Sequence, residues 1–397
     1  MTLSRIGHRV TGSDAPEIEE VRVGFIPLTD CASVVVAARL GFDRRYGIRI
    51  NLSRQLSWAA LRDRLIDGDL HAAHMLYGLA YGIELGIGGP RRPMAVLMTL
   101  NQNGQAITLG QKLRAAGITT GDALRKMIEA QPNPLRFAHT FATGTHAMWL
   151  YYWLAAHGID PLRAVHTRTV PPPQMVSHLV GDRIDGYSAG EPWNALAVAM
   201  GIGFTMTTSQ AIWPDHPEKV LASTREFARQ YPNTARALLM AVLDASRYID
   251  GHADPHDIAR LLADPTCVDT ALDTISERLK GNYLDGLGKA WRDAHRLRFH
   301  ADGEVNYPYL SDAMWFMSQQ RRWGMLEHAP DYHAVAAAVN QTALYCEAAS
   351  ALGIGVPHSP YRTSRLLDGR VWDGRDPESF AATGAFAFQT TTHAALA

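Results

Sequence analysis

The apolar positions of the first hundred residues predict strands that alternate with helices. Runs rich in β-branched and apolar residues are typical of buried parallel strands, and apolar stretches that end at a glycine are typical of helices. On these grounds we expect strands at 21–28 and 48–52, helices through 34–37 and 58–66, and two further strands within 94–108 around a turn at 101–104. Ser57 is the expected N-cap of the second helix, and Gly68 is its expected end.

A second unit with the same alternation begins near residue 112. Its expected strands lie at 135–141, 164–170 and 184–188, and its expected helices run from 146 to 157 and from the three prolines at 171–173 to Gly181. From about residue 224 to residue 350 the pattern is mainly helical, for example at 235–248 and 330–352.

This order of elements predicts an α/β protein of two lobes. Alternating strands and helices favour parallel sheets, whose ligands bind where loops leave the carboxyl ends of the strands. Two such units with crossing connections would face each other across a ligand cleft. We assign residues 21–111 plus 220–383 to lobe 1, including a helical C-terminal region, and residues 112–219 to lobe 2. Segments 1–20 and 384–397 are predicted to be flexible.

Composition narrows the class of protein. The 397 residues are 47% hydrophobic and 19% charged, which excludes a mostly disordered chain because such chains lack apolar material. Lys+Arg 38 against Asp+Glu 39 gives a net charge of -1, so the chain has no global basic field that would hold nucleic acid or an anionic membrane. We therefore expect neither direct nucleic-acid binding nor membrane binding.

Cysteine usage and the N-terminal residues favour a cytoplasmic location. Cys31, Cys267 and Cys346 are few, odd in number and far apart, which is not the pattern of a disulfide framework. Charged residues interrupt the first twenty positions, where a secretory signal needs about 7–15 apolar residues. No stretch elsewhere approaches the roughly 20 apolar residues of a membrane helix.

The chain carries no motif of a common enzyme class. It has no phosphate-binding loop, no dinucleotide fingerprint after a strand and no nucleophile elbow, so we expect neither an enzyme nor a cofactor. His71 and His74 have helical H-x-x-H spacing, but without a third ligand a packed or hydrogen-bonded pair is favoured over a metal site. Cys31 has no evident base beside it, and we assign it a small apolar role near the cleft.

Two predicted helix starts offer the chemistry of an anion site. Trp58 and His146 each begin a helix that follows a strand, and a helix start presents unpaired N–H groups and the positive end of the helix dipole. Trp58 adds a flat wall with one N–H donor, and His146 adds a further donor. From spacing alone, a core tryptophan and a solvent-facing histidine fit these positions equally well.

Several long motifs, in order, resemble one protein family. The runs GFIPLTDCA, QLSWAALRDRL, NQNGQAI, TGTHAMWLYYWLAAHGIDP, TVPPPQMV, GEPWNA and HPEKVLAS are similar to the nitrate- and bicarbonate-binding proteins of the NrtA/CmpA kind, from about residue 21 to the C-terminal region. The resemblance implies a type II periplasmic-binding-protein fold that closes on a small oxyanion.

The resemblance also implies a set of ligand-binding residues. Carried over position by position, it makes Trp58 the cleft wall and a donor, Gln105 an amide donor, His146 a direct donor, Gly190 a backbone contact and Lys219 the compensating cation. Lys219 favours nitrate or nitrite over bicarbonate. Thr145 and Glu191 are expected behind these residues, Thr145 as a cap and Glu191 orienting His146 or Lys219.

The expected cytoplasmic location sets the predicted role. The binding protein of a transporter delivers its ligand to the permease from outside the cytoplasm. For a cytoplasmic protein we therefore predict instead a nitrate/nitrite sensor of the NasS type. Such a sensor sequesters a NasT-type antiterminator, an RNA-binding regulator with an ANTAR domain, and releases it when the anion binds, which requires that the anion favour a conformation the regulator binds less well. The alternative is the nitrate-binding component of an ABC transporter. A thiamine-pyrimidine synthase of the same fold is disfavoured because the chain lacks a cysteine cluster.

Overall fold

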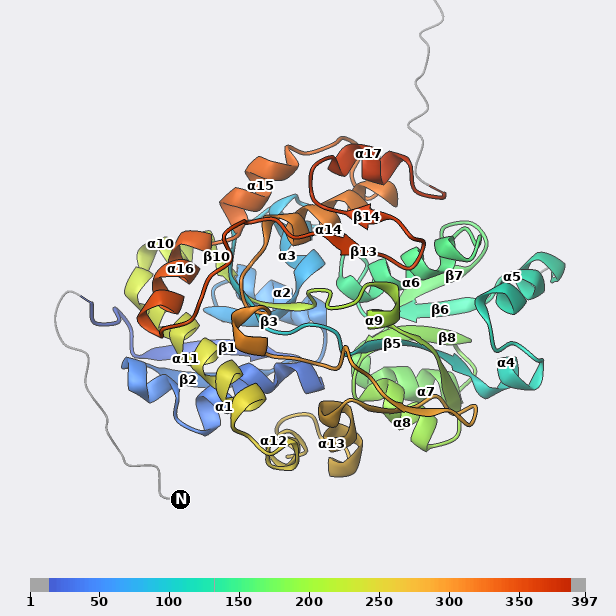
Figure 1. Ribbon diagram of the computed structural model, residues 1–397, viewed down its shortest axis with the longest axis horizontal. Helices are drawn as coiled ribbons and strands as arrows, with labels where there is room; N and C mark the ends of the chain where they lie inside the picture. Colours follow the sequence, from blue (N-terminus) through green and yellow to red (C-terminus); the bar gives the residue numbers. More distant parts are fainter. Residues whose placement is uncertain (1–13, 132, 387–397) are drawn as a thin grey trace, which may run out of the picture.

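The two alternating segments of the chain form two five-stranded sheets that lie side by side (Figure 1). The computed structural model describes residues 14–131 and 133–386. In the first sheet the strand order is β2-β1-β3-β10-β4, with β1 parallel to β2 and β3, and β10 antiparallel to both of its neighbours. Its strands are β1 (Glu20–Phe25), β2 (Arg49–Arg54), β3 (Ala72–Leu76), β4 (Met94–Thr99) and β10 (Lys219–Thr224).

The second sheet repeats this plan with the order β7-β6-β8-β5-β9. Here β6 is parallel to β7 and β8, and β5 is antiparallel to β8 and β9. The strands are β5 (Gln105–Gly110), β6 (Arg136–His139), β7 (His166–Thr169), β8 (Gly186–Gly190) and β9 (Gly203–Thr208). Each sheet therefore has one antiparallel strand, β10 or β5, as the fourth of its five strands, and this strand follows a segment that crosses between the lobes.

The first crossing lies earlier than the boundary predicted at residue 111. The turn at 101–104 does not join β4 and β5 into a hairpin, because β4 ends in the first sheet and β5 belongs to the second. The chain returns to the first sheet at β10, which begins at Lys219. A turn sequence specifies local geometry but not the sheet that the following strand joins, so the sequence pattern placed β5 in the wrong lobe.

Helices cover the sheets, and several begin where the sequence predicts. Ser57 caps α2, since its Oγ accepts from the backbone N–H of Ala60 at 3.2 Å. The helices up to β10 are α1 (Ala32–Arg39), α2 (Trp58–Ile66), α3 (Tyr77–Glu84), α4 (Gln111–Ala115), α5 (Gly121–Ala130), α6 (Thr145–Ala156), α7 (Met175–Val180), α8 (Trp193–Ala199) and α9 (Ser209–Ile212), with short 3-10 turns η1 (Thr29–Cys31), η2 (Asp43–Tyr46) and η3 (Pro172–Gln174).

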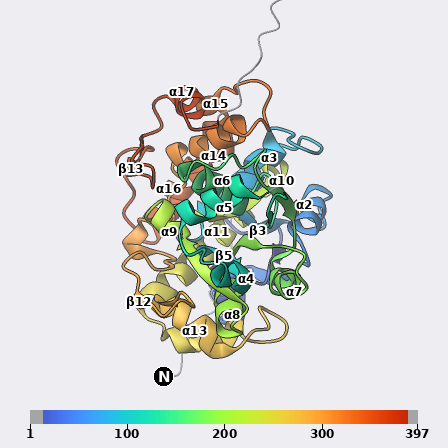
Figure 2. The same ribbon diagram turned by 90° about the vertical axis from the view of Figure 1, so that its right-hand side faces the viewer.

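The C-terminal region wraps both lobes. Figures 1 and 2 place α14, α15 and α17 at one end of the molecule and α13 at the other. The elements are α10 (Arg225–Gln230), α11 (Pro232–Gly251), α12 (Pro255–Leu262), α13 (Leu272–Lys280), β11 (Asn282–Leu284), β12 (Ala290–Arg292), η4 (Ala301–Gly303), α14 (Leu310–Arg322), α15 (Tyr332–Val339), α16 (Thr342–Ala351), β13 (Ser364–Arg365), β14 (Val371–Trp372) and α17 (Pro377–Ala382).

The helix expected over 330–352 is two helices. Asn340 breaks it with an extended ψ of 117°, and its side chain accepts from the Tyr81 hydroxyl at 2.6 Å and donates to the carbonyls of Pro308 and Tyr309. An asparagine side chain can form hydrogen bonds that take the place of those in a regular helix. Here its partners come from other elements of the fold, and the helix is interrupted at Asn340.

Part of the segment predicted to be flexible at the N-terminus is anchored. The Glu17 carboxylate accepts from the backbone N–H groups of Asn233 and Thr234, at the start of α11, where a helix leaves N–H groups unpaired. β1 already begins at Glu20. Residues 1–13 and 387–397, most of the two segments predicted to be flexible, lie outside the described residues.

One hydrophobic core is shared by the two lobes. It joins Leu76 and Tyr77 at the end of β3 to Trp149 of α6 and to Trp315 and Phe316 of α14. A second cluster packs α1 and α11 on the other face of the first sheet. No described helix is both long enough and apolar enough to cross a bilayer.

Candidate functional site

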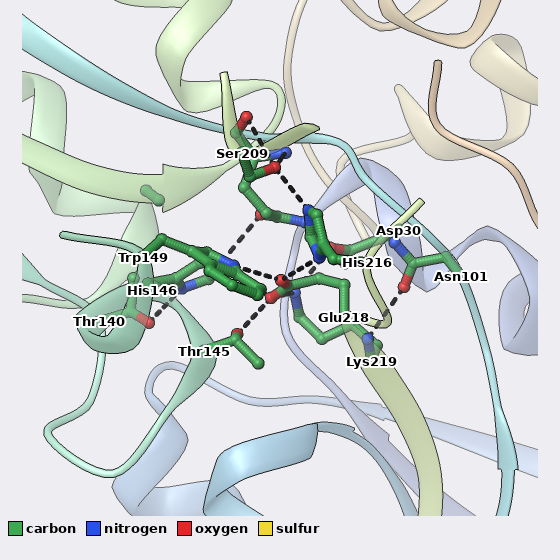
Figure 3. A network of polar contacts seen from close by, with 12 residues as sticks. Asp30, Asn101, Thr140, Thr145, His146, Trp149, Ser209, His216, Glu218 and Lys219 are labelled. Carbon is green, nitrogen blue, oxygen red and sulfur yellow. Dashed lines mark hydrogen bonds and ion pairs between the residues drawn. The ribbon is translucent and has the colours of Figure 1, made fainter. Parts of the chain in front are cut away.

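A cluster of buried polar side chains lies where the two sheets meet (Figure 3). We call it the central polar cluster. Its members, each at most 2% exposed, are Asp30, Trp58, His74, Gln105, Thr145, His146, Trp149, His216, Glu218 and Lys219. Such groups lose their hydration on burial, so their free energy depends on the partners they find inside the protein.

The members reach the cluster from the ends of strands and the starts of helices. Lys219 is the first residue of β10, and Gln105 is the first residue of β5. Trp58 begins α2, and Thr145 and His146 begin α6. Because the two sheets contribute from opposite sides, residues up to 189 positions apart in the chain meet here. This placement agrees with the general position of ligand sites in α/β proteins.

Lys219 lies between two carboxylates. Its Nζ donates to Asp30 Oδ2 at 2.8 Å and to Glu218 Oε1 at 2.9 Å. Burial by itself would lower the pKa of Lys219, but the charges of Asp30 and Glu218 outweigh it, and the pKa is raised. Burial likewise works to raise the pKa of Asp30, yet Lys219 and His74 hold it below its usual value. Lys219 and Asp30 therefore both stay charged.

Glu218 is held by neutral donors as well as by Lys219. The Thr145 hydroxyl donates to its Oε1, and Trp149 Nε1 donates to its Oε2 at 2.8 Å. Burial raises the pKa of Glu218 above its usual value even though Lys219, Thr145 and Trp149 favour the ionised form. Of the two carboxyl groups in the cluster, Asp30 and Glu218, Glu218 is therefore the one that is protonated more readily.

The contacts of His146 define its tautomer. Gln105 Nε2 has two acceptors, Asp30 Oδ2 and the Asn103 carbonyl, both at 3.2 Å, which turns Gln105 Oε1 toward His146 Nε2 at 2.9 Å. Nε2 must therefore carry the hydrogen, and Nδ1 accepts from the Thr140 hydroxyl at 2.5 Å. Burial, then Lys219, lower the pKa of His146, so the ring is neutral.

Trp58 and Gly190 complete the set predicted from the sequence. The Trp58 ring lies beside Lys219 Nζ, 5.8 Å from its centroid, and its Nε1 has no hydrogen-bond partner among the described residues although the side chain is fully buried. Gly190 pairs with Gln105 across β8 and β5, and a Cβ there would lie 2.6 Å from Gln105 Oε1. A side chain at position 190 would therefore clash with the cluster. All five predicted ligand residues come together.

Glu191 does not orient His146 or Lys219, contrary to the sequence-based expectation. Its Oε1 pairs with Arg278 Nε at 2.9 Å, and its Oε2 accepts from the Ala195 backbone N–H at 3.0 Å. Arg278 belongs to α13 and is 87 residues from Glu191 in the chain, so no local pattern could reveal the pair. Thr145 does support the cluster, but through Glu218.

His71 and His74 do not form a pair. His74 lies in β3 and His71 directly precedes that strand, so the chain is extended here and not helical, and side chains three positions apart point to opposite sides. His74 Nε2 contacts Asp30 at 2.8 Å, whereas His71 Nδ1 accepts from the Arg22 backbone N–H at 3.2 Å. Cys31 is buried in the second apolar cluster, 3.9 Å from Cys267 between the sulfur atoms.

Sequence reasoning missed the carboxylates of the cluster. Asp30 stands in the motif GFIPLTDCA and Glu218 directly precedes Lys219 in HPEKVLAS, so both lay inside the quoted runs. The available signal was that a buried lysine requires a carboxylate partner. Which carboxylates serve could be read only from the structure.

Comparisons with known proteins place this arrangement in a family. The model of the NMT1-like family matches residues 14–263. The nitrate/nitrite binding protein NrtA of Nostoc is 35% identical over 388 residues, covering 94% of this chain and 87% of NrtA, and that of Synechocystis is 34% identical over 383 residues, covering 94% and 86%. The crystal structure of the periplasmic nitrate-binding protein NrtA from Synechocystis PCC 6803 is 33% identical, with a TM-score of 0.89 and coverage of 93% of this chain and 99% of that one.

The fold is therefore that of the periplasmic-binding-protein-like α/β class with two sheets, as the sequence predicts, and the central polar cluster lies between those sheets. The chain belongs to the NMT1-like family and, within it, is related to the NrtA proteins. These relatives are named as binding proteins, and the prediction that the chain is not an enzyme is confirmed.

Proposed function

We propose that the central polar cluster binds nitrate or nitrite. The observation that carries this proposal is the unpartnered Nε1 of Trp58, a buried donor on a ring whose centroid lies 5.8 Å from Lys219 Nζ. Buried donors are almost always paired, so an orphan beside a cation favours an acceptor that is not part of the protein. The names of the NrtA relatives support the identity of that acceptor.

The chemistry of the donors suits a small monovalent oxyanion. Lys219 supplies one positive charge, and Gln105, His146 and Trp58 supply neutral N–H groups from both lobes. A planar anion with one charge is balanced by a single lysine and satisfied by such donors, whereas a phosphate would demand more cations. Inside the protein Lys219 and Gln105 both donate to Asp30, so the anion must compete with this carboxylate for them.

Trp58→Phe tests the proposal because it removes the orphan N–H and keeps an aromatic ring. We expect nitrate affinity to fall about tenfold, since a hydrogen bond to a charged acceptor contributes about 1.5 kcal/mol or more. Calorimetric titration with nitrate, nitrite and bicarbonate would measure the change.

Trp323→Phe is the matched control. Trp323 is also buried with an unpartnered Nε1, but it packs against Tyr151 and Arg322, outside the cluster. Both substitutions shrink a buried ring and should lower the free energy of unfolding to a similar extent. Equal affinities for the two variants, or no titration heat from the unsubstituted protein, would contradict the proposal.

The relatives favour delivery of the bound anion to an ABC transporter over the sensor role predicted from the sequence. The related NrtA of known structure is named as periplasmic. Another relative, named as the nitrate import ATP-binding protein NrtC of Synechocystis, is 35% identical over 373 residues, which cover 92% of this chain but only 55% of NrtC. We therefore propose transport delivery as the role of this chain. The NasS-type sensor, with its NasT-type partner and cytoplasmic location, stays a prediction.

The sensor role and the transport role predict different experimental results. For a sensor, an immobilised NasT-type antiterminator would retain the full-length protein without nitrate and release it when nitrate is added. For delivery, the protein would be recovered from the periplasm of its native host, and deletion of its gene would abolish high-affinity nitrate uptake. Retention by the antiterminator that nitrate reverses would overturn the transport role.

A further inference from the structure

The central polar cluster contains more negative than positive charge. Lys219 faces Asp30 and Glu218, while the buried histidines of the cluster have lowered pKa values and are neutral. With both carboxylates ionised the cluster carries one net negative charge. A bound monovalent anion would bring this to two negative charges in a site shielded from water, which is strongly unfavourable unless one of them is neutralised.

The contacts identify the group that can accept a proton. Asp30 contacts His74 Nε2 at 2.8 Å in addition to Lys219 and Gln105. It would therefore keep the His74 contact if Lys219 and Gln105 both turn toward an anion. Glu218 would keep only the neutral donors Thr145 and Trp149. His146 is not the group that accepts the proton, because its Nδ1 already accepts from the Thr140 hydroxyl and the positive charge of Lys219 disfavours a positive charge on the His146 ring.

Other charged groups around Glu218 do not replace this proton. His216 Nδ1 is 3.7 Å from Glu218 Oε2, but that nitrogen points to the Pro217 carbonyl at 3.0 Å and the pKa of His216 is lowered to about 3 by burial. Lys219, His146, His216 and Trp149 face Glu218 directly. Through one of these neighbours, Glu218 also faces Asp30 of η1, His74 of β3, His139 of β6, Asp215 of the crossing segment and Arg362 of the C-terminal region.

We propose that Glu218 takes up one proton from solvent for each monovalent anion that binds, so that anion binding at this site is coupled to proton binding. This inference rests on the proposed function. No bond of the anion breaks: the proton adds to a carboxylate oxygen of Glu218, the anion replaces that carboxylate as the partner of Lys219, and the net charge of the cluster is unchanged. Divalent anions are disfavoured, because keeping the net charge of the cluster unchanged would then require the uptake of a second proton.

The direction of the pKa of Glu218 supports this assignment. Burial already raises it while Lys219 is in contact, and loss of that contact would raise it further. Proton uptake on binding makes affinity increase as the pH falls, by at most about tenfold per pH unit where Glu218 is ionised in the free protein.

The test is calorimetric titration of the full-length protein with nitrate at one pH near 8, in two buffers with different heats of ionisation. The difference in observed heat gives the number of protons bound with nitrate. We expect about one proton for the unsubstituted protein, close to zero for Glu218→Gln, and about one for the control Glu129→Gln, whose side chain is exposed in an i,i+4 pair on α5.

Three results would overturn the inference, and they are distinguishable. Nitrate binding without proton uptake would reject the coupling but leave the proposed function intact. Proton uptake that persists in Glu218→Gln would place the proton on another group. If nitrate does not bind at all, the proposed function fails and the coupling fails with it. Because the measurement on the unsubstituted protein needs no variant, it decides the first and third results even if Glu218→Gln does not fold. An infrared difference spectrum on adding nitrate should show a protonated carboxyl group.

Discussion

Single buried charges in this protein find partners that are remote in sequence. Asp30 and Lys219 are 189 residues apart, and Glu191 and Arg278 are 87 residues apart. The Glu191–Arg278 pair is at most 5% exposed and links lobe 2 to α13 of the C-terminal region. Taking such a pair out of water is costly, and removing one partner leaves the other buried and uncompensated.

Glu191→Gln should therefore destabilise the fold by about 3–5 kcal/mol, because Arg278 keeps its charge without a counter-ion. Urea unfolding at neutral pH would measure this change. Glu129→Gln breaks an exposed pair with Arg125 and should change stability by no more than about 0.5 kcal/mol. Similar losses for the two variants would show that the buried pair does not have the importance assigned to it.

At the scale of elements, glycines allow α3 of the first lobe to touch the loop that leads into α6 of the second. A Cβ at Gly78 would lie 2.4 Å from the Thr143 carbonyl oxygen, and one at Gly144 would lie 2.5 Å from Leu76. This approach fixes the start of α6, where Thr145 and His146 reach the central polar cluster. At Gly78 the atom that a Cβ would meet belongs to the backbone of Thr143, so the rotation of a side chain cannot relieve the clash there.

Gly78→Ala is expected to destabilise the protein by about 1–3 kcal/mol, because overpacking against backbone forces the two elements apart. Nitrate affinity should fall as well, since His146 would move with α6. Gly251→Ala, at the end of α11 with open space around the added methyl, should be neutral or stabilising by up to about 1 kcal/mol. Thermal unfolding and nitrate titration of both variants check this, and an unaffected Gly78→Ala would refute the tight contact.

At the scale of the whole molecule, buried neutral histidines tie stability to pH. Burial lowers the pKa of His139 to about 4 and of His216 to about 3, and it also lowers the pKa of His74 and His146. In the unfolded chain histidines titrate near pH 6.5, so below that pH the unfolded chain binds protons that the folded protein does not. Burial also raises the pKa of Glu218, Asp43 and Asp312, and these groups oppose the trend, whereas it lowers the pKa of His71, His157 and His178, which add to it.

The free energy of unfolding should consequently fall as the pH drops from about 7 to about 5, with each such histidine contributing about 1.4 kcal/mol per pH unit once the unfolded chain is protonated. Urea unfolding at several pH values would give the slope. His139→Gln should reduce that slope by about one proton, whereas substitution of the exposed His328 by Gln should leave it unchanged. A stability that is flat over this range would contradict the proposed neutral state of the histidines.

The sequence by itself determined many of the local elements and the five candidate ligand residues. Ser57 as a cap and the helix at 58–66 follow from short-range patterns, and Lys219 as a candidate cation follows from the family motif, whereas the strand that begins at Lys219 was not predicted. Only the tertiary structure decided the sheet that β5 joins, the break at Asn340, and the partners of Glu191 and Lys219. The physical reason is range: caps and periodicity act within a few residues, whereas buried charges are satisfied by whatever carboxylate, amide or imidazole the packed sheets bring within hydrogen-bonding distance.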